Sequence, residues 1–312
     1  MTGLTIDALT VRIPLRGKDV VHAVTDVSLE VASGTVTALA GESGCGKSIV
    51  AAAILGVLPP AAVAHGSIRL DLGDRTIDVL GDTSPRAGRT SSPRRRARPA
   101  DHSYRGRHIA LVPQSPSTHF TPVRTIGSQL AETIAALGTD HTPADLADRA
   151  GLPSSALSLY AHELSGGMAQ RAAVAAALAG DPEVIVADEP TSGLDRARTD
   201  QIGQLLRACA DQGAAVLLIT HDLGHLLRAE IADTVAIMYA SRLMEVGPAR
   251  QVLDDPRHDY TGDLLAALPE RGLRPLPHPP QVLTNLTEIC PYAGGPTALV
   301  REDRRMIRRP RS

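Results

Sequence analysis

The chain has 312 residues, of which 43% are hydrophobic, and its formal net charge at pH 7 is −2. This length fits one large domain with an appendage, and the apolar fraction suffices for a buried core. The near-neutral charge excludes binding of nucleic acid through an overall field, and no run of eighteen apolar residues predicts a membrane span. The start lacks the pattern of a signal peptide, and three widely spaced cysteines fit reduced thiols in the cytosol.

Along the first eighty residues, apolar alternation predicts strands around a glycine-rich loop. The segment after this loop, SIVAAAILGVL, predicts a helix that Pro59 and Pro60 end, because proline cannot continue a helix. The expected elements are strands at 4–13, 20–31 and 35–40, a helix at 48–58, and a strand pair around 67–72 and 76–80.

Residues 81–107 interrupt this pattern. They are rich in Gly, Pro, Ser and Arg and almost free of apolar residues, which predicts a mobile surface loop. A second interpretation stays open, in which the arginines contact RNA, anionic lipid or a membrane partner.

Beyond this loop, strands alternate with helices, which predicts an α/β fold with a mainly parallel sheet covered on both faces. Phosphate ligands of such sheets bind beyond the carboxyl ends of the strands. From about residue 271 the chain is Pro-rich and then basic, so we expect a weakly ordered extension. The expected elements are strands at 109–112, 184–188, 215–220 and 234–239, an amphipathic helix at 123–137, further helices up to residue 180, and helices near 197–212 and after Asp222.

The strongest chemical signal is GESGCGKS, which fits the phosphate-loop pattern G-x-x-x-x-G-K-[ST] between a predicted strand and a predicted helix. Glycines let several backbone N–H groups point at one anion, and the helix N-terminus adds its positive dipole end. Lys47 is expected to reach the β- and γ-phosphates of ATP, and the Ser48 hydroxyl to bind Mg²⁺. The candidate nucleotide-binding residues are Gly41, Glu42, Ser43, Gly44, Cys45, Gly46, Lys47 and Ser48.

The segment VIVADE is an apolar strand that ends in two carboxylates. Asp188 is expected to hold the Mg²⁺ shell, and Glu189 to polarise the water that attacks the γ-phosphorus. The alternative is an ordinary acidic turn, since many strands end in one.

The segment LSGGMAQR places Ser165 at a predicted helix start, followed by Gly166 and Gly167. Serine is a good N-cap, but a glycine pair in the first turn lowers helix stability and needs a reason. A second phosphate-binding helix N-terminus supplies one, and an ordinary capped helix is the alternative.

In this order the motifs resemble those of the ABC (ATP-binding cassette) ATPases, over about residues 4–268. The resemblance implies a P-loop NTPase with a RecA-like core, an antiparallel β-subdomain and a helical subdomain near 115–180. It places the nucleotide-binding domain at 1–248 and a partly ordered C-terminal extension at 249–312. It also implies two ATP molecules at a dimer interface, each closed by the Ser165–Gly167 segment of the other subunit.

The resemblance assigns three further positions. Gln114 resembles the glutamine that binds the metal and links nucleotide state to the membrane partner, and a solvated loop glutamine is the alternative. Asp195 in SGLD resembles an aspartate of the dimer interface, although it could simply cap the next helix. His221 resembles a catalytic histidine that contacts the γ-phosphate, where a structural histidine is the alternative.

A narrower resemblance is to the peptide/nickel importer ATPases, in stretches such as QSPSTHFTPVRTIGSQLAE, YAHELSGGMAQR and DDPRHDYTGDLLAALP. It implies ATP hydrolysis that drives uptake of a peptide, nickel or metal chelate. The implied partners are permease subunits, a second ATPase and, indirectly, an extracytoplasmic binding protein, with no sequence-specific nucleic acid. The implied location is the cytoplasmic face of a bacterial membrane.

One departure concerns the adenine contact. ABC ATPases usually place an aromatic residue in the first strands, but no Phe, Tyr or Trp precedes Tyr104 here. Ile13 occupies the expected place, and His22 is the only ring nearby.

Two other functions also stay open: a soluble ABC ATPase without a permease, and an exporter motor.

Overall fold

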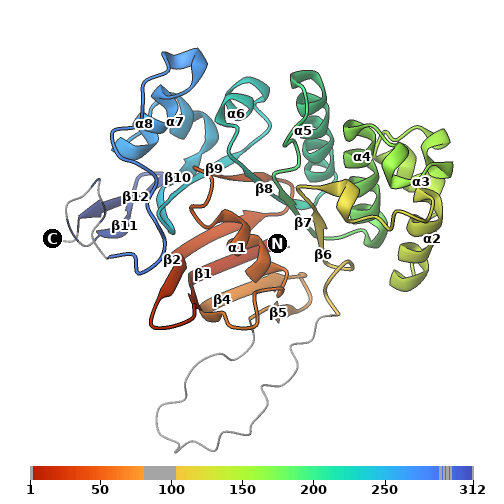
Figure 1. The fold of residues 1–312 in the computed structure, drawn as a ribbon, viewed down its shortest axis with the longest axis horizontal. Coiled ribbons are helices and arrows are strands. Elements are labelled where there is room, and N and C mark those ends of the chain that lie inside the picture. The colour runs from red at the N-terminus through yellow and green to blue at the C-terminus, as the bar shows by residue number, and fades with distance from the viewer. Residues whose placement is uncertain are drawn as a thin grey trace, which may run out of the picture.

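The computed structural model describes residues 3–80, 103–287, 290, 292, 295 and 297–310. Two β-sheets form its framework, and helices cover the larger one (Figure 1). Most of the loop predicted at 81–107, namely residues 81–102, lies outside the described residues.

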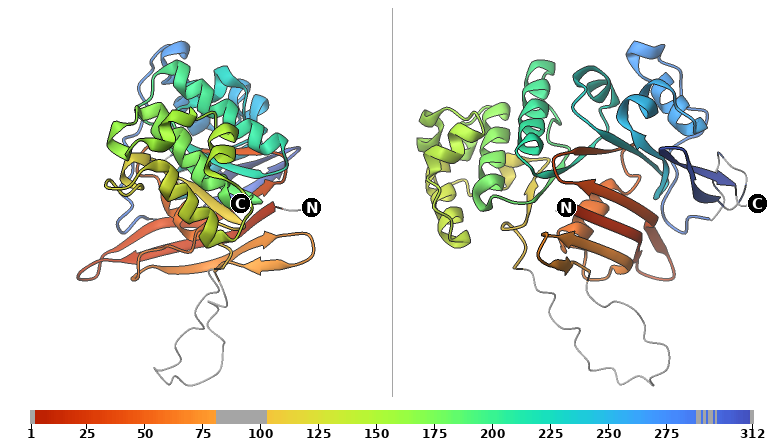
Figure 2. Two further views of the ribbon diagram at one scale, coloured as in Figure 1. Left: turned by 90° about the vertical axis from the view of Figure 1, so that its right-hand side faces the viewer. Right: turned by 180° about the vertical axis from the view of Figure 1, so that it is seen from behind.

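The smaller sheet has the strand order β2-β1-β4-β5 and is antiparallel throughout. It forms a separate layer beneath the larger sheet (Figure 2). Its strands alternate buried and exposed residues, as expected where one face packs on a core and the other meets solvent. The strands are β1 (Gly3–Pro14), β2 (Val20–Ala32), β4 (Val63–Asp71) and β5 (Thr76–Asp78).

The larger sheet has the order β11-β12-β10-β9-β3-β8-β7-β6. From β9 to β6 its strands are parallel, and β10, β12 and β11 continue it antiparallel. All residues of β3 and β8 are buried, which matches their apolar sequences and a sheet covered on both faces. The strands are β3 (Val36–Ala40), β6 (Ile109–Val112), β7 (Val184–Asp188), β8 (Ala215–Thr220), β9 (Thr234–Tyr239), β10 (Arg242–Pro248), β11 (Thr297–Glu302) and β12 (Arg305–Pro310).

The helices lie on both faces of the larger sheet, with a single helix on one face. Helix α1 packs in the core between the two sheets, and the other face of the larger sheet is covered by most of the remaining helices. None of the helices in the described part of the chain is long and apolar enough to cross a lipid bilayer. The helices are α1 (Lys47–Ile54), α2 (Ile126–Leu137), α3 (Pro143–Arg149), α4 (Gly166–Ala177), α5 (Arg196–Asp211), α6 (Leu223–Ala229), α7 (Ala249–Asp254) and α8 (Asp259–Ala266).

Two helix boundaries differ from the sequence expectation. The helix expected from Val123 begins at Ile126, because the Thr125 side chain accepts a hydrogen bond from Ser128 N and caps it, which leaves Val123 78% exposed. The helix expected to reach residue 58 ends at Ile54, and Gly56 then adopts a left-handed φ of 63°.

The C-terminal region is more ordered than its composition suggests. Strands β11 and β12 form a hairpin whose second strand pairs with β10, so the region beyond residue 271 contributes to the main sheet. The basic composition of its end predicts weak order, yet Arg305 and Arg308 are buried. Strand β12 lacks an apolar alternation because arginines, Arg305 and Arg308, occupy two of its buried positions.

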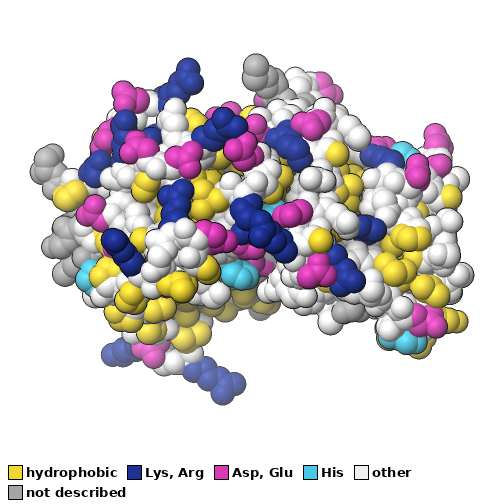
Figure 3. All heavy atoms as spheres, turned by 90° about the horizontal axis from the view of Figure 1, so that it is seen from above, with side chains coloured by type: hydrophobic (Ala, Val, Ile, Leu, Met, Phe, Trp, Pro, Cys, Tyr) yellow, Lys and Arg dark blue, Asp and Glu magenta, His cyan; other side chains and the backbone are white. Residues whose placement is uncertain are grey.

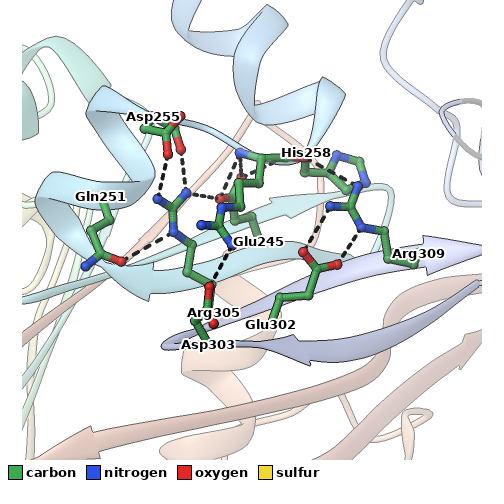
Figure 4. A network of polar contacts seen from close by, with 9 residues as sticks. Glu245, Gln251, Asp255, His258, Glu302, Asp303, Arg305 and Arg309 are labelled. Carbon is green, nitrogen blue, oxygen red and sulfur yellow. Dashed lines mark hydrogen bonds and ion pairs between the residues drawn. The ribbon is translucent and has the colours of Figure 1, made fainter.

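A buried carboxylate anchors this hairpin. Glu245 of β10 is fully buried, and its oxygens accept hydrogen bonds from Arg305 Nη1 at 3.1 Å and from the backbone N–H groups of Arg257 and His258 (Figure 4). Arg305 also donates to Asp255 Oδ2 at 3.1 Å. A buried charge is tolerated only when it is paired and hydrogen-bonded, so this network ties β12 to the β10–α8 connection.

Candidate nucleotide site

The phosphate-type loop connects β3 to α1, as the sequence predicted. Gly41 has φ 154° and Gly46 has φ 113°, and both pass against neighbouring backbone. A Cβ at Gly41 would lie 2.1 Å from Met238 O, and one at Gly46 would lie 2.1 Å from Ala23 O. Both glycines are therefore required by the loop's close packing as well as by its φ angles.

Lys47 is buried at the start of α1. Its Nζ donates to the carbonyl oxygens of Gly41 at 2.8 Å and Glu42 at 3.0 Å. The same nitrogen lies 3.9 Å from Glu189 Oε1. The loop thus curls around the ammonium group and holds it at the helix N-terminus, where an anion is also favoured.

The carboxyl end of β7 meets the start of α1. Ser48 Oγ donates to Asp188 Oδ1 at 3.2 Å. Burial raises the pKa of the Asp188 carboxyl, the Ser48 bond opposes the rise, and the nearby Glu189 charge adds to it. A hydroxyl and a carboxylate at this distance are the oxygen ligands that Mg²⁺ prefers, so these two residues fit the metal.

Glu189 has a left-handed backbone, with φ 49°, which a non-glycine residue rarely adopts. Its N–H donates to Ile219 O at 2.9 Å, which fixes the turn to neighbouring strand β8. Its carboxylate lies between Lys47 and His221, with Oε2 2.6 Å from His221 Nδ1. Such strain of about 1–3 kcal/mol is typical of residues that a site holds in a special orientation.

A cavity of about 390 Å³ is lined by Lys47, Ser48 and Glu189, whereas Asp188 and His221 are not among its lining residues. Gln114, which follows β6, lines it together with Glu189 and the phosphate loop. Ile13 lines it as well, whereas His22 is not among the lining residues. The structure therefore brings the predicted residues of four segments to one cavity. The lining residues are Ile13, Val21, Ala23, Ser43, Gly44, Gly46, Lys47, Ser48, Ile49, Gln114, Glu189 and Leu283.

The segment from Ser165 to Gly167 does not line this cavity. Ser165 is exposed and caps α4, because its Oγ accepts from Met168 N at 3.3 Å. Gln170 of the same helix is buried, and its Nε2 donates to Pro113 O at 3.5 Å, next to Gln114. Gln170 belongs to the LSGGMAQR segment but was not among the residues predicted for the site.

Asp195 also lies away from the cavity and caps α5, accepting from Arg198 N at 3.0 Å. This is the capping role that the sequence left open beside an interface role. The two roles are compatible, since the Asp195 side chain remains 56% exposed, with Oδ2 3.2 Å from Arg198 Nη1.

One contact to the phosphate loop comes from far along the chain. Tyr260 of α8 is fully buried, and its hydroxyl donates to Glu42 Oε2 at 3.1 Å. Its ring packs against Tyr239 at 4.3 Å between centroids and against Tyr292 at 5.4 Å. No sequence spacing relates these residues, so the contact could not be found before the fold was known.

A strand, a glycine loop and a helix that hold a lysine, with acidic residues at the next strand ends, define a P-loop nucleoside triphosphatase. Comparison with known proteins shows which family of such proteins the chain belongs to. The family described as ABC transporter matches residues 24–192, more than half of the chain. The chain belongs to the ABC transporter family and carries its ATPase cassette.

Relatives are similar over most of this chain. The putative peptide import ATP-binding protein of Brucella abortus is 36% identical over 313 residues, covering 93% of this chain and 88% of that protein. The oligopeptide transport ATP-binding protein OppD of Mycobacterium tuberculosis is 37% identical, and the glutathione import ATP-binding protein GsiA of Salmonella typhimurium is 37% identical. The chain spans 44% of the length of that OppD and 42% of that GsiA.

The fold matches solved cassettes. A dimeric ATP-binding cassette in a post-hydrolysis state, bound to ADP and Pi, superposes with a TM-score of 0.62 at 22% identity. The match covers 79% of this chain and 99% of that one. It confirms the predicted P-loop fold with its added β and helical parts.

Proposed function

We propose that the chain is the ATP-hydrolysing subunit of an importer that takes up peptides. The observation that carries this proposal is the convergence of Lys47, Ser48, Asp188, Glu189 and His221 at one end of the parallel sheet. The names of the relatives, which concern oligopeptides, peptides and glutathione, support the substrate class. Nickel or a metal chelate as the substrate is an alternative that the uptake experiment below distinguishes.

In this mechanism Lys47 and the loop N–H groups bind the β- and γ-phosphates. Ser48, Asp188 and Gln114 would hold Mg²⁺, which when bound would neutralise the charge that develops on the phosphates. Glu189 would accept a proton from the attacking water, and His221, whose Nδ1 lies 2.6 Å from Glu189 Oε2, would orient that carboxylate and contact the γ-phosphate. The left-handed backbone of Glu189 keeps this geometry fixed before nucleotide arrives.

The segment Ser165–Gly167, which is exposed at Ser165 and Gly166, and the exposed Asp195 would act on a second ATPase subunit. Both lie away from the cavity of their own chain, as a site completed across an interface requires. Gly167 is crowded by Arg198, whose Cδ would lie 3.1 Å from an added Cβ, so the α4 start and α5 start form one surface. The partner's phosphates would meet the N–H groups at the start of α4.

A permease would dock beside Gln114. A groove of about 680 Å³ lies between β6 and helices α2 and α4, and it is lined by mostly apolar residues that include Phe120, the chain's one phenylalanine. Pro113 lines the groove, and Gln114 lines the nucleotide cavity. Pro113 would thus face the permease and its neighbour Gln114 the nucleotide. Nucleotide binding could be coupled to permease movement through these two residues.

The same reading assigns residues 1–248 to the nucleotide-binding domain and 249–312 to the extension. The protein would sit on the cytoplasmic face of a bacterial membrane, with an extracytoplasmic binding protein as an indirect partner. Acidic and basic side chains are interspersed on the face seen from above (Figure 3). Such mixing gives no single-sign field for nucleic acid on that face.

Uptake by cells that lack this chain tests the proposal. The parent chain should restore uptake of a labelled tripeptide, and Lys47→Ala should abolish it because the charge facing the phosphates is lost. Lys18→Ala is the matched control, since Lys18 is the other lysine of the chain and is exposed. Restoration by Lys47→Ala would refute an ATP-driven role, uptake of ⁶³Ni²⁺ alone would change the substrate class, and peptide efflux would indicate an exporter.

A further inference from the structure

The nucleotide cavity has a polar part and an aliphatic part. The phosphate loop, Gln114 and Glu189 make the polar part. The aliphatic part comes from Ile13, Val21 and Leu283, and the last of these belongs to the C-terminal region. A nucleotide pairs a charged triphosphate with a flat, largely apolar base, so its base matches the aliphatic part.

Leu283 reaches the cavity because its segment pairs with β2. The backbone of Leu283 accepts a hydrogen bond from His22 N at 2.8 Å, and Val21 forms an antiparallel bridge with Thr284. In Figure 1 this segment runs from α8 past β2 towards β11. The pairing places Leu283 beside Val21, over the strand that lines the cavity.

Asn285 fastens the same segment at two points. Its N–H donates to Val20 O at 2.8 Å, and its Oδ1 accepts from Val20 N at 3.0 Å. Its Nδ2 donates to Asp19 Oδ1 at 2.8 Å. Asn285 has φ 51°, a left-handed conformation that asparagine tolerates better than most residues. Three hydrogen-bonding groups of Asn285, together with its left-handed backbone, thus hold a turn two residues beyond Leu283.

We propose that this C-terminal segment is part of the nucleotide site, with Leu283 contacting the base and Asn285 as its positioning residue. The inference rests on the proposed function, because it needs ATP in the cavity. It accounts for the missing aromatic residue: three aliphatic side chains from different segments enclose the base in place of a stacked ring. By linkage, nucleotide binding should also stabilise the C-terminal segment against local opening.

The competing reading is that residues 283–285 only cover the edge of β2. Covering requires the backbone bonds and is indifferent to the side chain of Leu283. The two readings therefore separate when that side chain is shortened and the backbone is left alone.

Calorimetric titration of the full chain with MgATP and with magnesium tripolyphosphate, which has no base, tests the proposal. Leu283→Ala should weaken ATP binding three- to tenfold, about 0.7–1.4 kcal/mol, and leave tripolyphosphate binding unchanged. Val282→Ala is the matched control, because Val282 is 75% exposed and does not line the cavity. Leu283→Met should bind ATP like the parent.

Asn285→Ala should weaken ATP binding selectively in the same way. If Asn285 acts through Leu283, the double variant should bind ATP no more weakly than the weaker single variant, because their effects are not additive. Additive losses would overturn the positioning role.

The outcomes keep the two proposals apart. If the parent binds both ligands and Leu283→Ala binds ATP equally well, the base contact is wrong and the proposed function stands. Equal losses of ATP and tripolyphosphate would show a general disturbance and also overturn the base contact. A parent that binds neither ligand would reject the proposed function and this inference with it.

Discussion

The two ends of the nucleotide cavity are built in opposite ways. The phosphate end comes from eight consecutive residues, Gly41 to Ser48, and the carboxyl end of the nearby strand β7. The aliphatic end combines β1, β2 and a segment from the C-terminal region. One end is thus a local motif, and the other exists only when distant parts of the chain pack together.

The difference lies in what each end must recognise. Phosphates need N–H groups and charges at fixed spacing, which one loop and one helix start can supply. An apolar base needs only contact area, which any aliphatic side chains at the right place can supply. We therefore expect the phosphate end to respond to single substitutions sharply and the aliphatic end to respond weakly.

The largest effect is expected at the phosphate end. Glu189→Gln should lower the ATP hydrolysis rate by about 10²–10⁴-fold, because a positioned base is lost, while ATP affinity stays near that of the parent. Phosphate release and calorimetric titration measure the two quantities. Glu230→Gln, at an exposed ion pair with Arg250, is the control. Hydrolysis by Glu189→Gln at the parent rate would remove Glu189 from the catalytic role.

An intermediate effect is expected in the network that anchors the C-terminal hairpin. Burial lowers the pKa of His258 to about 4 from the usual 6.5, although the Asp259 and Glu245 charges oppose this. Between these values the unfolded chain binds a proton that the folded chain does not. Stability is therefore complete above pH 6.5 and falls as pH drops towards 4, by at most about 3 kcal/mol from this residue.

His258→Asn should flatten that pH dependence. The His258 side chain accepts from Tyr260 N at 3.1 Å, and asparagine can cap the helix similarly without titrating. Denaturant unfolding at pH 7 and pH 4.5 measures the change, with exposed His65→Asn as the control. Equal pH dependence in parent and His258→Asn would show that other groups control acid stability.

The smallest effect is expected at the aliphatic end. Ile13→Tyr should tighten ATP binding by about 1 kcal/mol, because a ring can stack on adenine where isoleucine gives only dispersion contact. Titration of the parent, Ile13→Tyr and His22→Ala measures it. Weaker binding by the tyrosine variant would mean that Ile13 packs too tightly for a ring. A loss confined to His22→Ala would move the adenine contact to the histidine.

The sequence by itself determined the α/β fold, the phosphate loop and the acidic strand end. Each depends on residues close together in the chain: the spacing of two glycines and a lysine, or an apolar run that ends in Asp188 and Glu189. Such patterns can be recognised without knowledge of the fold because the backbone conformation that they need is local. The roles proposed for Gln114, Asp195 and His221 came from the family resemblance instead.

The tertiary structure alone decided how the C-terminal region takes part. Its composition suggested weak order, yet β12 joins the main sheet through Arg305 and Glu245, and Tyr260 reaches Glu42 of the phosphate loop. Leu283 lines the nucleotide cavity for the same reason. Contacts between residues so far apart follow from how the sheets and helices pack, and no spacing or composition along the chain encodes them.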